Sequence, residues 1–185
     1  MSEQAGRYQR SFGGLIGAMV VILLAIGAFV AFRAVNRDVP DGGPDPIDYL
    51  EQVGYAQEAD LDVVYPSSLP EGWYATSVTL GQETPPAWGI GMLTDTGSFV
   101  GIRQEQDDVE DLLATYVDEE HVDEAPAITV EGSIAPEWQG WTDDGGDRAY
   151  AAEVDGETVL VYGSASEDDL RTVVERLTTE PVPND

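Results

Sequence analysis

An apolar run near the amino terminus constrains this chain more than any other feature. The stretch RSFGGLIGAMVVILLAIGAFVAFR, residues 10–33, carries charge only on its two terminal arginines. As a helix rising about 1.5 Å per residue, residues 11–32 reach roughly 33 Å, enough to cross a hydrocarbon core of about 30 Å. A buried core helix would show a polar stripe, and a cleavable signal peptide would have a shorter apolar region. We therefore expect an uncleaved transmembrane helix over residues 11–32.

The charge distribution predicts how this helix is oriented. Two arginines precede the run and two follow it, so the local positive-inside count is tied. Residues 1–37 carry four arginines and one acid, which gives 4 − 1 = +3, and the remaining residues carry 4 − 35 = −31. Because the cell interior is electrically negative, we expect residues 1–10 to form a cytoplasmic tail and the acidic remainder to lie outside the membrane.

The apolar run also contains small residues at helical spacing. Gly13 and Gly17 form a G-x-x-x-G pair, a spacing that lets two helix backbones approach closely. Small residues are common in any membrane helix, so the pair has an incidental interpretation as well. A homodimer through Gly13 and Gly17 therefore stays a secondary hypothesis.

Composition excludes several classes of function for the acidic part. The chain has no cysteine, which removes disulfides, thiolate chemistry and cysteine-based metal sites. Its net charge of −28 opposes binding to nucleic acid. The same charge favours cationic partners or divalent ions, or it serves solubility in a salty medium.

The chain after the anchor is organised as a linker and one domain. The Pro- and Gly-rich residues 33–45 predict a linker, residues 46–180 a domain, and residues 181–185 a short tail. A first helix is predicted over 46–58, with Asp45 as N-cap and Pro46 as its first residue. Residues 118–126, DEEHVDEAP, are predicted to be an acidic loop.

Alternating and helical periodicities predict the rest of the domain. A helix is expected around LLATY, where apolar residues follow one face, and a second after Ser166, which forms a capping-box pattern with Asp169. Asp155-Gly156 predicts a hairpin, and Val159 to Tyr162 is apolar on both faces, as in a central strand. Strands are predicted at residues 73–80, 88–93, 98–104, 128–132, 137–142, 149–154 and 157–162. We therefore predict an α+β domain: an antiparallel sheet of about six strands with two or three packed helices.

Several short motifs occur together in a distinctive order. They are the anchor RSFGGLIGAMVVILLAIGAFV, then LPEGWYATSVTL, WGIGMLTDTGSFVGIRQ, GWTDDGGDRAY and TVLVYGSASEDDLRTVVERL. From roughly Arg10 to Leu177 the chain resembles an actinobacterial membrane-anchored family known as domain of unknown function 4245. The resemblance implies a location in the bacterial cell envelope, and it brings no catalytic residues.

The residues that could carry chemistry do not form a known catalytic motif. His121 is the only histidine and lies among acids, which favours a solvated loop residue over a catalyst. The acid clusters lack the spacing of an EF-hand, so we predict no metal site, no catalytic residues and no cofactor. Trp138 and Trp141 are the candidates for a partner surface, with burial in the core as the alternative interpretation.

These features predict a non-enzymatic protein of the cell envelope. A single-pass anchor would present an acidic α+β domain that binds an envelope protein or a cell-wall partner. Two alternatives remain open: a hydrolase that uses a pair of carboxylates, and a membrane-assembly subunit that acts through its transmembrane helix.

Overall fold

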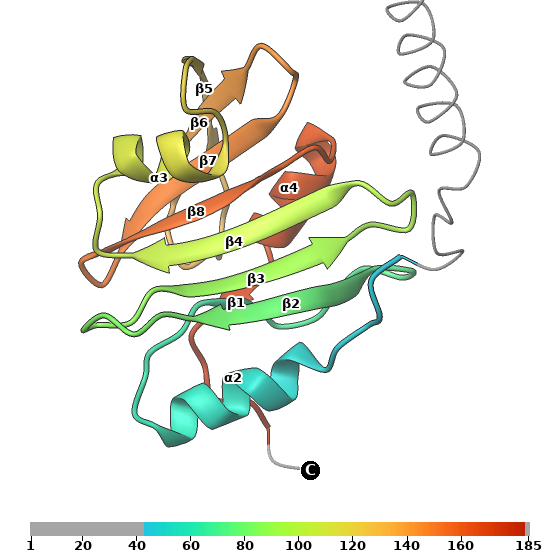
Figure 1. Cartoon of the computed structure of the whole chain (residues 1–185), viewed down its shortest axis with the longest axis vertical. Coiled ribbons are helices and arrows are strands. Elements are labelled where there is room, and N and C mark those ends of the chain that lie inside the picture. Colours follow the sequence, from blue (N-terminus) through green and yellow to red (C-terminus); the bar gives the residue numbers. More distant parts are fainter. Residues whose placement is uncertain (1–42, 184–185) are drawn as a thin grey trace, which may run out of the picture. The chain divides into compact units, whose positions relative to one another are not determined.

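The computed structural model describes residues 43–183, so the predicted anchor and the Gly13–Gly17 pair lie outside the described residues. Within the described residues, no helix is long and apolar enough to span a membrane. The described part is an α+β domain, as predicted, with three helices and an antiparallel sheet of seven strands. Figure 1 shows the helices distributed around this sheet.

The sheet contains the strands in the order β2-β3-β4-β8-β7-β6-β5. Their bounds are β2 Tyr74–Leu80, β3 Trp88–Leu93, β4 Phe99–Glu105, β5 Val122–Thr129, β6 Glu137–Asp143, β7 Arg148–Val154 and β8 Glu157–Gly163. All neighbouring strands are antiparallel. Two further short strands, β1 (Tyr65–Pro66) and β9 (Leu177–Thr178), pair with each other. Because β8 has three strands on either side, the prediction of a central strand is confirmed.

Local turn chemistry explains the hairpins. Gly97 has φ 83° in the β3–β4 turn, and Asp155 and Gly156 have φ 52° and 86° in the β7–β8 turn. Left-handed backbone at two consecutive positions is what a tight two-residue hairpin requires, and Asp-Gly supplies it at low cost. The predicted Asp155-Gly156 hairpin is confirmed.

The three helices are α2 (Tyr49–Glu58), α3 (Val109–Tyr116) and α4 (Glu167–Val174). The capping box predicted for α4 is present: the Asp169 amide donates to the Ser166 hydroxyl, and the Asp169 carboxylate accepts from the Ser166 amide. The predicted start of the first helix was wrong, because its N-cap is Asp48. Ile47 forms a β-bridge with Ala75 and donates to its carbonyl at 2.9 Å, so the backbone there is extended and the helix begins after it.

One strand begins earlier than predicted. The predicted acidic loop 118–126 ends early, since Val122 to Pro126 belong to β5. This strand lies at the edge of the sheet, where Asp123, Glu124 and Pro126 are exposed to solvent. An edge strand can carry charges and a proline, because part of its backbone and side chains face water. Strand β5 therefore begins six residues before the predicted range 128–132, and the main sheet has seven strands where about six were predicted.

The two faces of the sheet are packed differently. The larger hydrophobic cluster lies on the face covered by α2, α4 and the β1–β9 pair, and we call this the core face. On the opposite face, Leu112 and Leu113 of α3 pack on Ala149, Ala151 and Leu160. We call this the α3 face. Figure 1 shows α3 in front of the sheet and α4 behind it.

Candidate functional site

Helix α3 covers only the middle of its face of the sheet. The helix has eight residues, and its buried side chains are Leu112 and Leu113. Beneath it, β7 presents Ala149 and Ala151, whose small side chains let the helix approach closely. Because the helix is short, the sheet surface on either side of it remains partly exposed.

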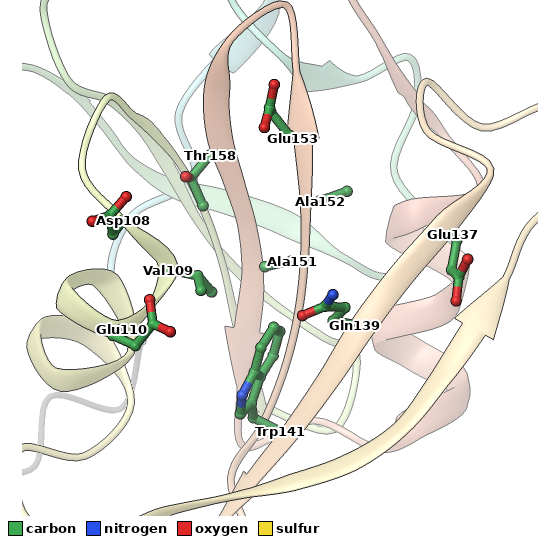
Figure 2. A pocket seen from close by; sticks show the side chains of 10 residues that line it. All are labelled: Asp108, Val109, Glu110, Glu137, Gln139, Trp141, Ala151, Ala152, Glu153 and Thr158. Carbon is green, nitrogen blue, oxygen red and sulfur yellow. The ribbon is translucent and has the colours of Figure 1, made fainter.

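A groove of about 450 Å³ lies between the start of α3 and strands β6 to β8. Its lining residues are Asp108, Val109, Glu110, Glu137, Gln139, Trp141, Ala151, Ala152, Glu153 and Thr158. Figure 2 shows Trp141 and Gln139 between the two sides of the groove, with Asp108 and Glu110 on the α3 side and Glu137 on the other. A volume of this size can accommodate a small ligand or a few residues of a peptide.

Four carboxylates give the groove a strongly negative potential. Asp108 and Glu110 come from the start of α3, Glu137 from β6 and Glu153 from β7. No basic side chain is among the lining residues. Clefts lined by one sign of charge focus the electric field and attract ligands of the opposite sign. The groove therefore favours a cation.

Asp108 occupies the N-cap position of α3, but its carboxylate makes no capping hydrogen bond. An N-cap aspartate usually accepts from an amide two or three residues later, as Asp48 does from Glu51 in α2. The Asp108 carboxylate is thus free to face the groove and a ligand in it.

Trp141 provides the large apolar surface of the groove. It is half-buried, and within residues 43–183 its indole N–H donates no hydrogen bond, in contrast to those of Trp88 and Trp138. An indole ring attracts a cation to its face, and its free N–H can donate to a ligand. Trp141 is therefore equipped for both contacts.

The structure separates the two tryptophans that the sequence suggested as a pair. Trp138 has 0% exposure on the core face, and its indole donates to the Ala135 carbonyl at 3.0 Å. It is a core residue and cannot belong to a partner surface. Trp141 lies three positions further along β6, and an odd separation places two strand residues on opposite faces.

The other side of α3 carries a cluster of aromatic rings. The Tyr162 ring lies 5.6 Å from Tyr116 and 5.8 Å from Phe99, and the Arg103 guanidinium lies 4.4 Å above the Tyr116 ring. Burial and a hydrogen bond to Glu105 raise the pKa of Tyr116 to about 12, so its hydroxyl stays protonated. A Cβ at Gly101 would lie 2.5 Å from the Tyr162 ring, so glycine is needed for the ring to lie on the sheet. These rings pack on one another.

His121 and the acid clusters form no metal centre in the described residues. His121 Nε2 lies 3.3 Å from Asp123 Oδ1, and both side chains are exposed. The backbone amides of His121 and Glu120 donate to Asp118, and these bonds lower the pKa of its carboxyl group. Across residues 43–183, no group of three histidine or acidic side chains is placed to share an ion.

A larger cavity, of about 930 Å³, lies between α2 and residues 181–183. Gln57 joins the two sides, since its amide donates to the Glu180 carbonyl and its oxygen accepts from the Val182 amide. We interpret this cavity as space left between α2 and the C-terminal segment where the two pack together.

Apart from Trp141, the groove residues were missed at the level of the sequence, although one signal for them was present. Glu137, Gln139 and Trp141 alternate along β6 and therefore lie on one face. Asp108 and Glu110 could not be added to them from the sequence, because only the strand order brings the start of α3 next to β6 and β7.

Comparison with known proteins agrees with the resemblance noted above. A family model described as "Protein of unknown function (DUF4245)" matches residues 7–177. The chain belongs to the DUF4245 family. No curated protein and no solved structure matches it. The groove therefore has to be interpreted from its own chemistry.

Proposed function

We propose that this DUF4245 protein is a single-pass membrane protein of the bacterial cell envelope whose acidic domain is a non-enzymatic binding module. The apolar residues 11–32 support the anchor, and the contrast of +3 with −31 around it supports an exterior domain. The partner is an envelope protein segment or a cell-wall component that carries cationic groups.

The groove beside α3 is the observation on which the binding role depends. Its carboxylates can accept charge-assisted hydrogen bonds from a guanidinium or ammonium group, while Trp141 offers a ring face to the same cation. Only Thr158 supplies a hydroxyl among the lining residues, and that hydroxyl donates to the Asp107 carbonyl at 2.8 Å. The arrangement suits recognition of a cation better than nucleophilic attack.

Magnitudes indicate what kind of binding to expect. Each exposed carboxylate contributes only about 0.2–1 kcal/mol to an ion pair. A cation over an indole ring adds roughly 0.5–2 kcal/mol, depending on how dry the contact is. Several weak contacts in a strong field produce fast association and a marked dependence on salt. We therefore expect reversible binding that weakens as ionic strength rises.

The test measures binding of a tetra-arginine peptide to the full-length chain in non-ionic detergent. Trp141→Ala should weaken binding by about tenfold, the equivalent of roughly 1.4 kcal/mol. Glu110→Gln should weaken it less, since it removes one exposed charge. Glu175→Gln is the matched control, because Glu175 is an exposed acid at the end of α4. If Trp141→Ala binds as well as the natural chain, the groove is not the site.

The alternatives are tested separately. Replacing residues 11–32 with an unrelated apolar helix should leave peptide binding unchanged, whereas a membrane-assembly subunit would lose its function. Turnover of cell-wall glycans that disappears in Glu110→Gln or Glu153→Gln would indicate a carboxylate-based hydrolase instead.

The exterior location of the domain has its own test. A cysteine introduced into the β7–β8 turn should react with an impermeant thiol reagent on intact cells if the domain is exterior.

A further inference from the structure

The two edges of the main sheet are protected to different degrees. At one edge, β5 carries Asp123 and Glu124, a proline at position 126, and a register irregularity between Ala125 and Ile128. Charges, prolines and bulges are the features that prevent an edge strand from pairing with another chain. Strand β5 therefore has three of the common forms of protection: charges, a proline and a bulge.

At the opposite edge, β2 has little of this protection. Its sequence, YATSVTL, contains no charged residue and no proline, in a chain with 36 acidic residues. A register irregularity between Ala75 and Ser77 and a β-bridge from Ile47 to Ala75 protect only its first residues. Valine, threonine and tyrosine also favour the extended conformation. Strand β2 is therefore a suitable template for an additional strand.

The register identifies which backbone groups of β2 face outward. Gly81 donates to the Ala87 carbonyl on the β3 side at 2.7 Å. Inward and outward backbone groups alternate along an antiparallel strand, so Thr79 also faces β3 while Val78 and Leu80 face away from it. Within residues 43–183, the outer edge of β2 receives one backbone bond, from Ile47 to Ala75. This bond shows that the edge can accept a strand, and residues 76–80 remain open.

Solvent reaches this open segment. Ser77 and Thr79 are exposed on the α3 face of the sheet, and Leu80 is 50% exposed. Figure 1 shows β2 as the outermost strand, with α2 running beside it. The exposure of Leu80 means that α2 does not cover this end of the strand.

Acidic residues lie at both ends of the uncharged strand. Glu71 precedes β2, and Asp95 packs against Gly72 near the same end. Beyond the other end, Glu83 lies next to Gly81 and accepts from the Ala87 amide at 3.1 Å. A complementary segment would be uncharged in its centre and basic at both ends.

We propose that the outer edge of β2 binds an extended segment of a partner protein, with β-prone uncharged residues flanked by arginine or lysine. The segment adds an eighth strand to the sheet. Main-chain hydrogen bonds to Val78 and Leu80 provide much of the affinity, and the acids at the two ends select basic flanks. This surface is separate from the groove beside α3, and the proposal does not depend on what the groove binds.

The experiment uses the full-length chain in detergent and a synthetic peptide with alternating threonine and valine between arginine pairs. Hydrogen exchange should slow at the amides of Val78 and Leu80 when the peptide is added. Val78→Pro removes one outward N–H without removing a bond to β3, and it should weaken binding by about tenfold. Val78→Ala is the matched control, because it shortens the side chain but keeps the N–H. Leu80→Pro is a second test if Val78→Pro does not fold.

Four outcomes would overturn the proposal. One is equal binding by Val78→Pro and Val78→Ala. Another is equal binding of a peptide with glutamate flanks, since the acids at the ends of β2 should reject it. The third is concentration-dependent protection of Val78 and Leu80 without peptide, which would show that a second copy of the chain occupies the edge. The fourth is loss of binding in Trp141→Ala alone, which would assign the peptide to the groove.

Discussion

Trp138 and Trp141 lie on the same strand, three residues apart, and belong to opposite faces of one sheet. Trp138 is fully buried on the core face and donates its indole N–H inside the protein, whereas Trp141 is half-buried, lines the groove and keeps its N–H free. The core face is continuous, but the α3 face is covered by a single short helix. The comparison suggests that one face maintains the fold while the other is available for binding.

The largest expected effect is the difference in stability lost when each of these two tryptophans is replaced by alanine. Trp138→Ala should destabilise the domain by about 3–5 kcal/mol, because a large buried ring is lost and the surrounding core cannot fully collapse. Trp141→Ala should cost about 1 kcal/mol or less, since the ring is only partly removed from water. Urea denaturation of both variants measures the difference. Equal losses of stability would mean that the α3 face is as important to the fold as the core face.

A leucine pair extends the comparison to the helices. Leu112 of α3 and Leu170 of α4 are both fully buried, on opposite faces. We expect Leu170→Ala to cost about 3–4 kcal/mol and Leu112→Ala about 2 kcal/mol, because α3 packs on alanines over a small cluster and can shift to fill the space. The free energies of unfolding of the two variants test this order. The reverse order would show that α3 is held rigidly in place.

The sequence predicted features that depend on neighbouring residues. Asp155-Gly156 identified the β7–β8 hairpin, Ser166 and Asp169 identified the start of α4, and the apolar run in β8 identified the central strand, because each signal is local. The first part of strand β5 was missed, since its acids resemble a loop when its position at the sheet edge is unknown. The groove was missed because residues from α3 and β6 meet only after the strands are ordered.

Substitutions at the N-caps of α4 and α3 should differ less in their effect on stability than the substitutions in the two faces of the sheet. Ser166→Ala should destabilise the domain by about 1 kcal/mol, because it removes the hydroxyl that accepts from the Asp169 amide at 3.2 Å. Asp108→Ala should cost only about 0.3 kcal/mol, the favourable interaction of a charge with the helix dipole, since no capping bond is lost. Thermal denaturation of the two variants provides the measurement. If Asp108→Ala is the more destabilising, its carboxylate caps α3 after all and is not free for a ligand.

The smallest expected effect is a pH dependence in the turn that follows Trp141. Burial, with a contribution from the charge of Asp143, raises the pKa of Asp147 above the ordinary value of an aspartate. The native state therefore disfavours the ionised form, so this group lowers stability as pH rises through its folded pKa.

Asp147→Asn removes this penalty. The variant should be more stable than the natural chain near neutral pH, by less than about 0.5 kcal/mol. The gain should disappear once the pH falls below about 3.9, where aspartate is protonated in both folded and unfolded states. Urea denaturation at a series of pH values tests the sign, with Asp144→Asn as the control for losing a charge from the same turn. A gain that grows toward acid pH would contradict the raised pKa and would mean that the Asp147 charge stabilises the turn.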